Sequence, residues 1–537
     1  MGKITKYLNQ LITGNVFDTP EILDAYSTDH SALKVKPKFV AVPESTDDIQ
    51  KLLRFFNQIA AKDIPVSITP RGSGLDESGA DLSNGLILST EKLNRLLEID
   101  SRERLVRVQA GITLKELNTA LSVSGLCIPV GGCDSCTIGG LISNNPIDAY
   151  YAKYGGIRNF VERIEVVLAN GDCLQTAKLK KYNVAKKASE KSLEGDIYRK
   201  ISKLLKDDRF LLEELSKKQQ GKEGYPTILD VSRKDRLDLA PLFFGAQGTL
   251  GVVSEVILRA IPLRRKPARA VVTFKELDPA VRFMQEAKEM KPRELNLYDL
   301  KIIQEVKETG KNLDGIIRKL EDGYVVYLSF DEHQSFMMRK VLAKKNSFAR
   351  TTKFITESPE NKYLISEVEH ALPSYLNRLR NSERVPVLTD FYLPGGNLVS
   401  FVKDLEVLEK KLGLEMSIFG SYNNSIYSLR PKFKLDDPEY NKKFATFLRA
   451  GAYVINRQEG ILVGGSPEGR VKAIVTNAEM LDSKKKFYSK IKKIFDQNNI
   501  LNPDIKLGAN SKFTLTHLRG MDVAKSEAPQ AKQPTKQ

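Results

Sequence analysis

The chain has 537 residues, 41% of them hydrophobic and 28% charged, which allows two or three globular domains with hydrophobic cores. No apolar run is long enough to span a bilayer and the first residues lack a signal-peptide pattern, so we expect a cytoplasmic protein. The net charge of +17 would suit nucleic acid or an anionic membrane, but the basic residues are spread along the chain without an RNA-binding or zinc-finger motif. This predicts a solvated surface and no specific nucleic-acid partner, with peripheral membrane contact left open.

Strands and helices alternate in the first half of the chain. Residues 45–61 carry apolar residues at helical spacing, and Ser45 and Asp48 are spaced as an N-terminal capping box. Asn170 and Gly171 indicate a tight hairpin turn. In chain order, the predicted elements are strand 38–43, helix 45–61, strands 65–68 and 85–90, a strand pair in 94–111, helix 113–125 and hairpin 161–176.

The pattern changes after a lysine-rich stretch at about 178–225, which reads as a helical insertion on the surface. From about residue 266, strands alternate with amphipathic helices, which favours an α+β domain with an antiparallel sheet. A closing helix and loop are predicted at 484–508. The last stretch, 522–537, has almost no apolar residues and is predicted to be disordered.

The four cysteines are too sparse for a structural metal site. Cys133 and Cys136 form one CxxC pair, and Cys127 and Cys173 stand apart from it. A tetrahedral zinc site or an iron–sulfur cluster needs more thiolates in closer groups. The sequence therefore predicts four reduced thiols, with a redox-active Cys133–Cys136 pair as the alternative.

Three glycine-rich loops stand next to predicted strands. They read PRGSGLDESG (70–79), PVGGCDSCTIGGLISNN (129–145) and GAQGTLGVVSE (245–255). Glycine lets backbone N–H groups approach an anion closely, so such loops suit a phosphate group. The first loop alone matches neither the dinucleotide-binding fingerprint nor the P-loop, and a tight turn would explain it equally well.

In this order, the three loops resemble those of flavoproteins in the vanillyl-alcohol oxidase / p-cresol methylhydroxylase (PCMH) superfamily. Within it, the chain looks most similar to the FAD-linked D-2-hydroxyacid dehydrogenases, from about residue 25 to residue 508. The resemblance implies an α+β fold, and the absence of histidine from 70–79 favours noncovalent FAD. The implied segments are an N-terminal helical segment (1–36), a two-subdomain PCMH-type FAD-binding domain (37–265, with the insertion at about 178–225), a substrate or cap domain with an antiparallel sheet (266–475), a C-terminal helix returning to the FAD domain (476–510) and a disordered tail (511–537).

The resemblance also implies which residues contact FAD. A dianionic diphosphate needs several converging N–H donors, which agrees with glycine at these positions. Asn502 would lie near the isoalloxazine ring. The implied cofactor-binding residues are Arg71, Gly72, Ser73, Gly74, Ser78 and Gly79; Thr137, Ile138, Gly139, Gly140 and Asn144; Gly248, Thr249, Gly251, Val252 and Val253; and Asn502.

The chain departs from the resemblance where metal-dependent members carry histidines and a glutamate. Ser421 and Ser428 stand at two histidine positions, and Gly465 and Ser466 at the later Glu-His pair. Serine hydroxyls and a glycine do not replace imidazole and carboxylate as transition-metal ligands. We therefore expect no metal site at these positions.

On the substrate side, Arg378 in YLNR resembles an arginine that binds the substrate carboxylate, although an exposed helix arginine is the simpler interpretation. Tyr422 and Tyr427 are candidate acid–base groups or packing residues, and no catalytic base is assigned. The favoured hypothesis is an FAD-dependent dehydrogenase of a 2-hydroxy acid or related alcohol, acting without metal and passing electrons to a carrier protein, a quinone or oxygen. The alternative is a catalytically degenerate FAD-binding protein that serves as a binding or structural subunit.

Overall fold

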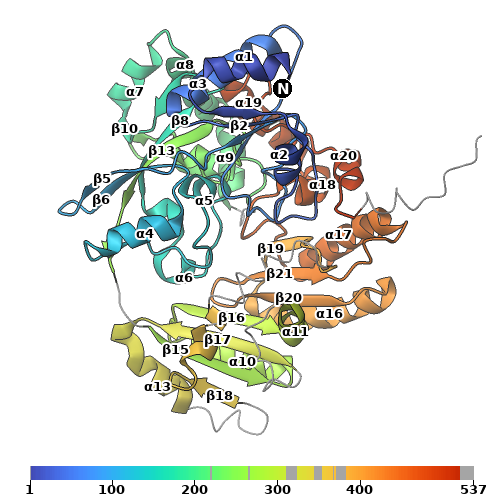
Figure 1. The fold of residues 1–537 in the computed structure, drawn as a ribbon. Coiled ribbons are helices and arrows are strands. Elements are labelled where there is room, and N and C mark those ends of the chain that lie inside the picture. The colour runs from blue at the N-terminus through green and yellow to red at the C-terminus, as the bar shows by residue number, and fades with distance from the viewer. Residues whose placement is uncertain are drawn as a thin grey trace, which may run out of the picture.

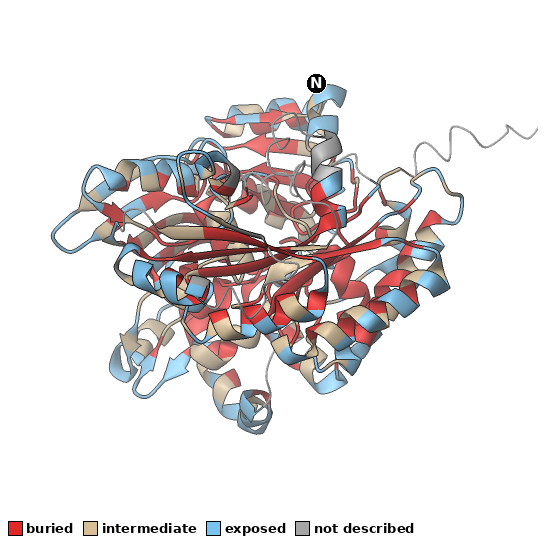
Figure 2. Cartoon of the chain, turned by 90° about the horizontal axis from the view of Figure 1, so that it is seen from below, coloured by how far each residue is buried: buried red, intermediate tan, exposed pale blue. Residues whose placement is uncertain are grey.

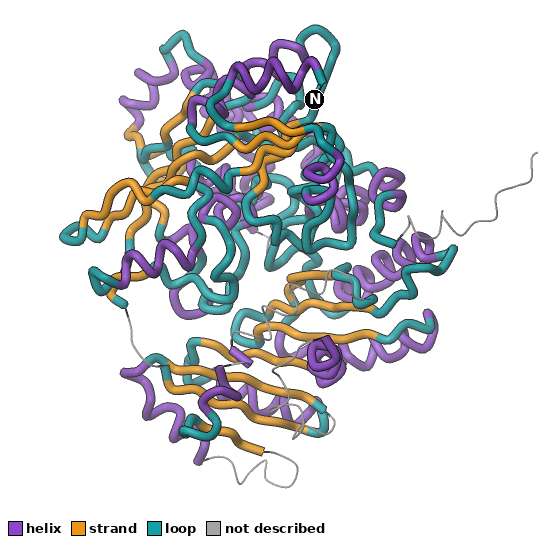
Figure 3. The backbone as a smooth tube through the Cα atoms, in the orientation of Figure 1, coloured by secondary structure: helices purple, strands orange, loops and turns teal. Residues whose placement is uncertain are grey.

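The computed structural model describes residues 2–217, 221–263, 267–309, 323–343, 353–366, 368–369 and 383–520. Figure 1 shows an upper half, formed by the N-terminal part of the chain and the C-terminal helices, and a lower half built around one large sheet. Loops gather where the two halves face each other (Figure 3). Arg378 and residues 521–537 lie outside the described residues. The predicted disordered tail (511–537) is wrong at its start, because residues 511–516 form the helix α20 (Ser511–Thr516), in which Thr514 is buried.

The first sheet of the upper half has the order β1-β2-β4-β3, with β2 and β3 parallel to β4. The first long predicted helix is confirmed as α3 (Thr46–Ala60), whose Ser45 side chain accepts the N–H of Asp48. Asp48 does not complete the capping box, because its carboxylate accepts the N–H groups of Thr13 and Gly14 and so anchors the N-terminal segment. The strands are β1 (Asn15–Phe17), β2 (Phe39–Val42), β3 (Ile68–Arg71) and β4 (Leu86–Ser89).

The second sheet is antiparallel and has the order β5-β6-β13-β8-β9. It confirms the strand pair predicted in 94–111 and the hairpin that turns at Asn170 and Gly171. The helix predicted at 113–125 is α4 (Leu114–Ser122), and Thr113 and Glu116 form its complete capping box. The strands are β5 (Leu96–Asp100), β6 (Leu105–Gln109), β8 (Val161–Val167), β9 (Cys173–Gln175) and β13 (Val252–Arg259).

The lysine-rich stretch is helical, as predicted, but it is not confined to the surface. Its helices are α7 (Lys181–Ala188), α8 (Leu193–Asp207) and α9 (Arg209–Lys217). Ile197 and Tyr198 of α8 are buried in the same hydrophobic core as residues of the C-terminal helix α19. The high lysine content of this stretch did not indicate an apolar face. This face packs against α19 and so attaches that helix to the upper half.

The lower half confirms the predicted antiparallel sheet, which has seven strands in the order β18-β15-β17-β16-β20-β21-β19. The helices α10, α16 and α17 contribute to its main hydrophobic core. The strands are β15 (Ala268–Phe274), β16 (Glu294–Asp299), β17 (Tyr324–Phe330), β18 (Lys353–Thr356), β19 (Leu388–Tyr392), β20 (Met416–Ser421) and β21 (Ile426–Pro431). The helices are α10 (Leu277–Lys288), α11 (Leu300–Thr309), α13 (Ser335–Ala343), α14 (Lys362–Ser366), α16 (Leu398–Leu412) and α17 (Tyr440–Arg457).

The C-terminal part of the chain lies in the upper half, where α18 and α19 are found (Figure 1). Figure 2 shows buried residues running along the strands, with exposed residues on the outer turns of the helices. The remaining elements are α1 (Lys3–Leu11), α2 (Pro20–Ala25), α5 (Ile138–Asn144), α6 (Tyr151–Tyr154), α18 (Gly469–Glu479), α19 (Asp482–Phe495) and α20 (Ser511–Thr516), with short strands β7 (Leu126–Cys127), β10 (Leu179–Lys180), β11 (Ser232–Arg233), β12 (Arg236–Leu237) and β14 (Ile261–Pro262).

Candidate cofactor site

A cavity of about 370 Å³ lies between the two halves of the molecule. Its upper wall is formed by the three glycine loops predicted from the sequence. Its lower wall is formed by β16, β19, β20 and β21 of the large sheet, together with Ser466 from the loop before α18. The structure thus brings together segments that are more than three hundred residues apart in the sequence.

The three glycine loops pack directly on one another. A Cβ atom on Gly72 would lie 2.2 Å from Oγ1 of Thr137, so the first loop contacts the second. A Cβ atom on Gly248 would lie 2.9 Å from Cδ of Pro70, so the third loop contacts the first. Gly248 also has a φ of +72°, a conformation that glycine adopts without strain. Larger residues at Gly72 or Gly248 would force the loops apart.

Backbone donors of the first loop are available at the cavity. Residues 72–75 all line it, and no other described residue accepts a hydrogen bond from their N–H groups. Several N–H groups in one short glycine-containing loop form a cradle for an anion. This donor set fits the diphosphate of FAD.

The predicted cofactor residues divide into those at the cavity and those behind it. Thr249 is held by its hydroxyl, which contacts the Tyr225 hydroxyl at 2.8 Å, and Gly251 packs against Val166. Residues of the second group, such as these two, support the loops from outside the cavity. The residues that line the cavity are Arg71, Gly72, Ser73, Gly74, Ser78, Thr137, Gly139, Gly140, Asn144, Gly248, Val252 and Val253, and those that do not are Gly79, Ile138, Thr249, Gly251 and Asn502.

Asn502 connects the first and third loops through its side chain. Its Nδ2 donates to the backbone carbonyls of Ala80 and Gln247, each at 2.7 Å. Its Oδ1 accepts from the Thr69 hydroxyl at 3.0 Å. Because the side chain is buried and fully engaged in these bonds, Asn502 holds the loops in place from outside the cavity.

Acidic residues within the first loop were not singled out from the sequence. The Asp76 carboxylate accepts the N–H groups of Ser78 and Ala80, so these two donors are already used inside the loop. Burial, reinforced by the nearby charge of Asp81, raises the pKa of Asp76 to about 6. Glu77 pairs with Arg430 of β21, which links this loop to the lower half. The partners of Asp76 are its neighbours in the sequence, whereas Arg430 lies 353 positions after Glu77.

The lower wall contains three of the four positions at which the sequence comparison predicts other residues in place of metal ligands. Ser421, Ser428 and Ser466 line the cavity, whereas Gly465 lies behind it. The Ser428 hydroxyl accepts the N–H of Asp390, a cavity residue with a φ of +52°. The wall therefore presents hydroxyl groups and a carboxylate to the cavity.

Two lysines lie behind this wall. Lys472 donates to the Ser466 hydroxyl at 3.0 Å, and Lys222 donates to the Gly465 carbonyl at 2.7 Å. Burial lowers the pKa of Lys472 to about 8 and that of Lys222 to about 7, although Asp390 opposes both shifts. No motif marks these lysines in the sequence, because only the fold places them beside residues 465 and 466.

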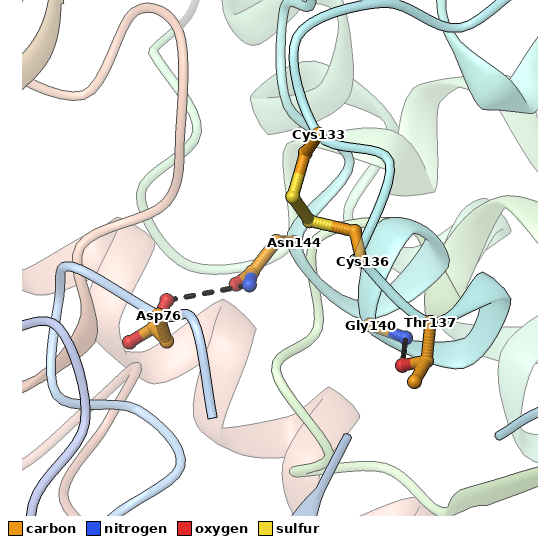
Figure 4. Close-up of a disulfide and its surroundings, with 6 residues drawn as sticks. All are labelled: Asp76, Cys133, Cys136, Thr137, Gly140 and Asn144. Atoms are coloured by element: carbon orange, nitrogen blue, oxygen red, sulfur yellow. Dashed lines mark hydrogen bonds between the residues drawn. A yellow bond between two sulfur atoms is a disulfide. The ribbon is translucent and has the colours of Figure 1, made fainter. Parts of the chain in front are cut away.

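The prediction of four reduced thiols is wrong for one pair, because Cys133 and Cys136 form a disulfide. The alternative prediction paired these two cysteines. Both line the cavity in the second loop, directly before Thr137, and Figure 4 shows them facing the same region as Asn144 and Asp76. Cys127 and Cys173 take part in no disulfide.

The two candidate tyrosines do not line the cavity. Tyr427 is fully buried in the lower core, and Tyr422 is buried beside Lys288. Burial raises the pKa of both phenols, so neither is poised for proton transfer near neutral pH. The packing interpretation of these residues fits the structure.

Comparisons with known proteins agree with the geometry. The family "FAD binding domain" matches residues 37–177, and the family "FAD linked oxidases, C-terminal domain" matches residues 263–505. Solved structures of similar fold include 4-ethylphenol oxidase from Gulosibacter chungangensis (TM-score 0.66, 14% identity, covering 91% of this chain and 94% of that chain) and p-cresol methylhydroxylase with substrate bound (TM-score 0.65, 13% identity, covering 93% and 95%).

Curated relatives point to one group of flavoproteins. The chain is 25% identical to a D-lactate dehydrogenase of Archaeoglobus fulgidus over 89% of its own length and 95% of the relative. It is 24% identical to a D-2-hydroxyglutarate dehydrogenase of Pantoea ananatis over 89% of its own length, but it spans only 48% of that relative. The chain belongs to the FAD-binding PCMH-type oxidoreductases with an FAD-linked oxidase C-terminal domain, distantly related to these dehydrogenases and to glycolate oxidase. Within the described residues, every helix is too short or too polar to cross a membrane.

Proposed function

We propose that the protein oxidises a 2-hydroxy acid or a related alcohol by hydride transfer to noncovalently bound FAD, without a metal ion at positions 421, 428, 465 and 466. The observation that carries this proposal is the cavity, in which a glycine cradle faces a wall of hydroxyl groups and the Asp390 carboxylate. FAD, when bound, supplies the hydride acceptor. The absence of histidine from residues 70–79 supports noncovalent binding.

The chain's own residues would hold both molecules. The N–H groups of residues 72–75 would bind the diphosphate. Ser421, Ser428 and Ser466 would orient the substrate. Lys472, which donates to the Ser466 hydroxyl, would favour an anionic group such as a carboxylate. Arg378, as a second carboxylate partner, stays a prediction, and so does the cytoplasmic location.

A second candidate function is supported by the same lower wall. Without imidazole ligands, the protein would be an FAD-binding subunit that has lost turnover. A test with electron acceptors would not distinguish the two candidate functions, because both leave a reducible flavin in the protein. A test with substrates distinguishes them.

The test starts with the purified protein and added FAD. A yellow protein whose flavin is released by acid precipitation supports noncovalent binding, whereas a colourless protein that takes up no FAD contradicts both candidates. The loaded protein is then mixed without oxygen with D- and L-lactate, glycolate and D- and L-2-hydroxyglutarate. Bleaching of the flavin by any of them, unchanged by EDTA, supports the dehydrogenase. An unbleached flavin across the panel favours the degenerate subunit.

A further inference from the structure

The Cys133–Cys136 disulfide occupies an unusual place for a structural cross-link. Both cysteines line the cavity, and Cys136 directly precedes Thr137, which contacts Gly72 of the anion cradle. Any flavin held by these loops would share the cavity with the disulfide. The disulfide also belongs to the only CxxC sequence in the chain.

A stabilising role explains this disulfide poorly. The two cysteines are separated by three positions, so the cross-link closes a very short loop. The loss of chain entropy in the unfolded state grows with the length of the closed loop, and a short loop gains least. The segment is also anchored without the disulfide, because the carbonyls of Asp134 and Cys136 accept the N–H groups of Lys115 and Leu114 at the start of α4, each at 2.9 Å.

The disulfide lies between the cavity and the solvent. The two cysteines are half-buried, and Asp134 and Ser135 between them are exposed. A thiol of an external partner can therefore approach from outside while a ligand in the cavity approaches from within. Accessible disulfides of this kind take part in exchange more readily than buried structural ones.

We propose that Cys133 and Cys136 form a second redox centre that takes electrons from the reduced cofactor in the cavity and passes them to a dithiol/disulfide carrier outside. This inference rests on the proposed function, because it requires bound FAD. Two electrons and two protons leave the dihydroflavin, the Sγ–Sγ bond breaks, and two thiols form. The thiols then reduce a disulfide of the carrier by exchange, and the Cys133–Cys136 bond forms again. Electrons from the flavin would thus reach an external carrier through two cysteines that the chain already contains.

The test reduces the flavin without any substrate. The full chain loaded with FAD is photoreduced without oxygen, using EDTA and a deazaflavin, and thiols are trapped with N-ethylmaleimide under denaturing conditions and mapped by mass spectrometry. We expect alkylation of Cys133 and Cys136 to rise with flavin reduction. The electrons taken up per bound flavin should be about twice those taken up by a Cys133→Ser/Cys136→Ser variant, because that variant retains only one two-electron centre.

Two controls isolate the path through the flavin. Protein free of FAD, illuminated in the same way, should keep its disulfide, and Cys173→Ser should behave as the unmodified chain does, because Cys173 is not part of the pair. The proposal is overturned if the flavin becomes fully reduced while Cys133 and Cys136 stay resistant to alkylation, or if both are already alkylated before reduction. A protein that binds no FAD at all fails the proposed function instead. If the double variant does not fold, the comparison of loaded and FAD-free chains still decides the question.

Discussion

The two walls of the cavity are built from different parts of the polypeptide. The upper wall is defined by backbone, since glycines at 72 and 248 let three loops touch and leave N–H groups available. The lower wall is defined by side chains, such as Ser428 bound to Asp390 and Ser466 bound to Lys472. Backbone N–H groups are present whatever the side chains are, so a wall made of backbone can bind the same ligand group in many sequences. A wall made of side chains can change its chemistry by substitution while the fold stays the same. In the proposed function, the upper wall would bind the cofactor and the lower wall would select the substrate.

The largest expected effect concerns the ion pair that supports the lower wall from behind. Nζ of Lys506 lies 2.8 Å from Oε2 of Glu468, and both side chains are buried. Lys506→Met leaves the glutamate charge without its partner, so the free energy of unfolding should fall by about 3–5 kcal/mol. Urea denaturation measures this change. Lys485→Met, which removes the exposed partner of Asp482, is the control and should cost less than about 1 kcal/mol. Equal effects of the two changes would contradict the importance of the buried pair.

An effect on cofactor affinity tests the upper wall. Gly72→Ala places a Cβ atom against Thr137 and separates the first two loops, so the dissociation constant for FAD should rise at least about tenfold, or ~1.4 kcal/mol. Fluorescence quenching of FAD during titration measures it. The matched control is Gly396→Ala, where no atom lies within 4 Å of the added Cβ and where affinity should not change. If Gly72→Ala binds FAD normally, close packing of the loops is not required for the cradle.

The next prediction concerns the pH dependence of stability that a buried carboxyl of the cavity should cause. Asp148 lines the cavity and accepts the N–H groups of Gly131 and Tyr150, and burial raises its pKa from 3.8 to about 7. Between about pH 4 and pH 7, the Asp148 carboxyl is protonated in the folded protein and ionised in the unfolded chain. The free energy of unfolding therefore falls as pH rises through this range, and the contribution of Asp148 is constant above it.

Asp148→Asn keeps the acceptor oxygen and removes the charge. The variant should match the parent near pH 4 and exceed it at pH 8 by on the order of 4 kcal/mol in the free energy of unfolding, at about 1.4 kcal/mol for each unit of the pKa shift. Urea unfolding at several pH values provides the measurement. A stability difference that is independent of pH would show that the carboxyl titrates normally in the folded protein.

The smallest effect lies outside both walls. Arg209 and Glu213 pair on the exposed helix α9 at 2.9 Å, with 78% and 49% of their side chains accessible. Arg209→Ala should change the free energy of unfolding by less than about 0.5 kcal/mol and leave FAD affinity unchanged. A larger loss in thermal or urea unfolding would show that this exposed pair contributes to the stability of the fold.

The difference between the walls also explains what the sequence could predict. Glycine at 72, 74 and 248 is visible as a pattern because the backbone requires it, and the antiparallel sheet followed from strand and helix periodicity. Lys472 could not be predicted, since its role depends on Ser466 and on Thr389, whose carbonyl it also contacts. The sequence favoured reduced thiols over the Cys133–Cys136 disulfide, because the spacing of the cysteines does not reveal how tightly the second loop turns. Asp76 was overlooked inside a loop that was interpreted as a phosphate cradle.

The bonds of Asn502 have a consequence for the order of events during synthesis. Its partners lie 433, 422 and 255 positions earlier in the chain. Contacts of such long sequence separation form late, and domains begin to fold from the N-terminus as the chain emerges. The three glycine loops therefore leave the ribosome well before the residue that fixes two of them together. Acquisition of the flavin should accordingly be a post-translational event, and nascent chains that end before residue 502 should remain colourless even with FAD in excess.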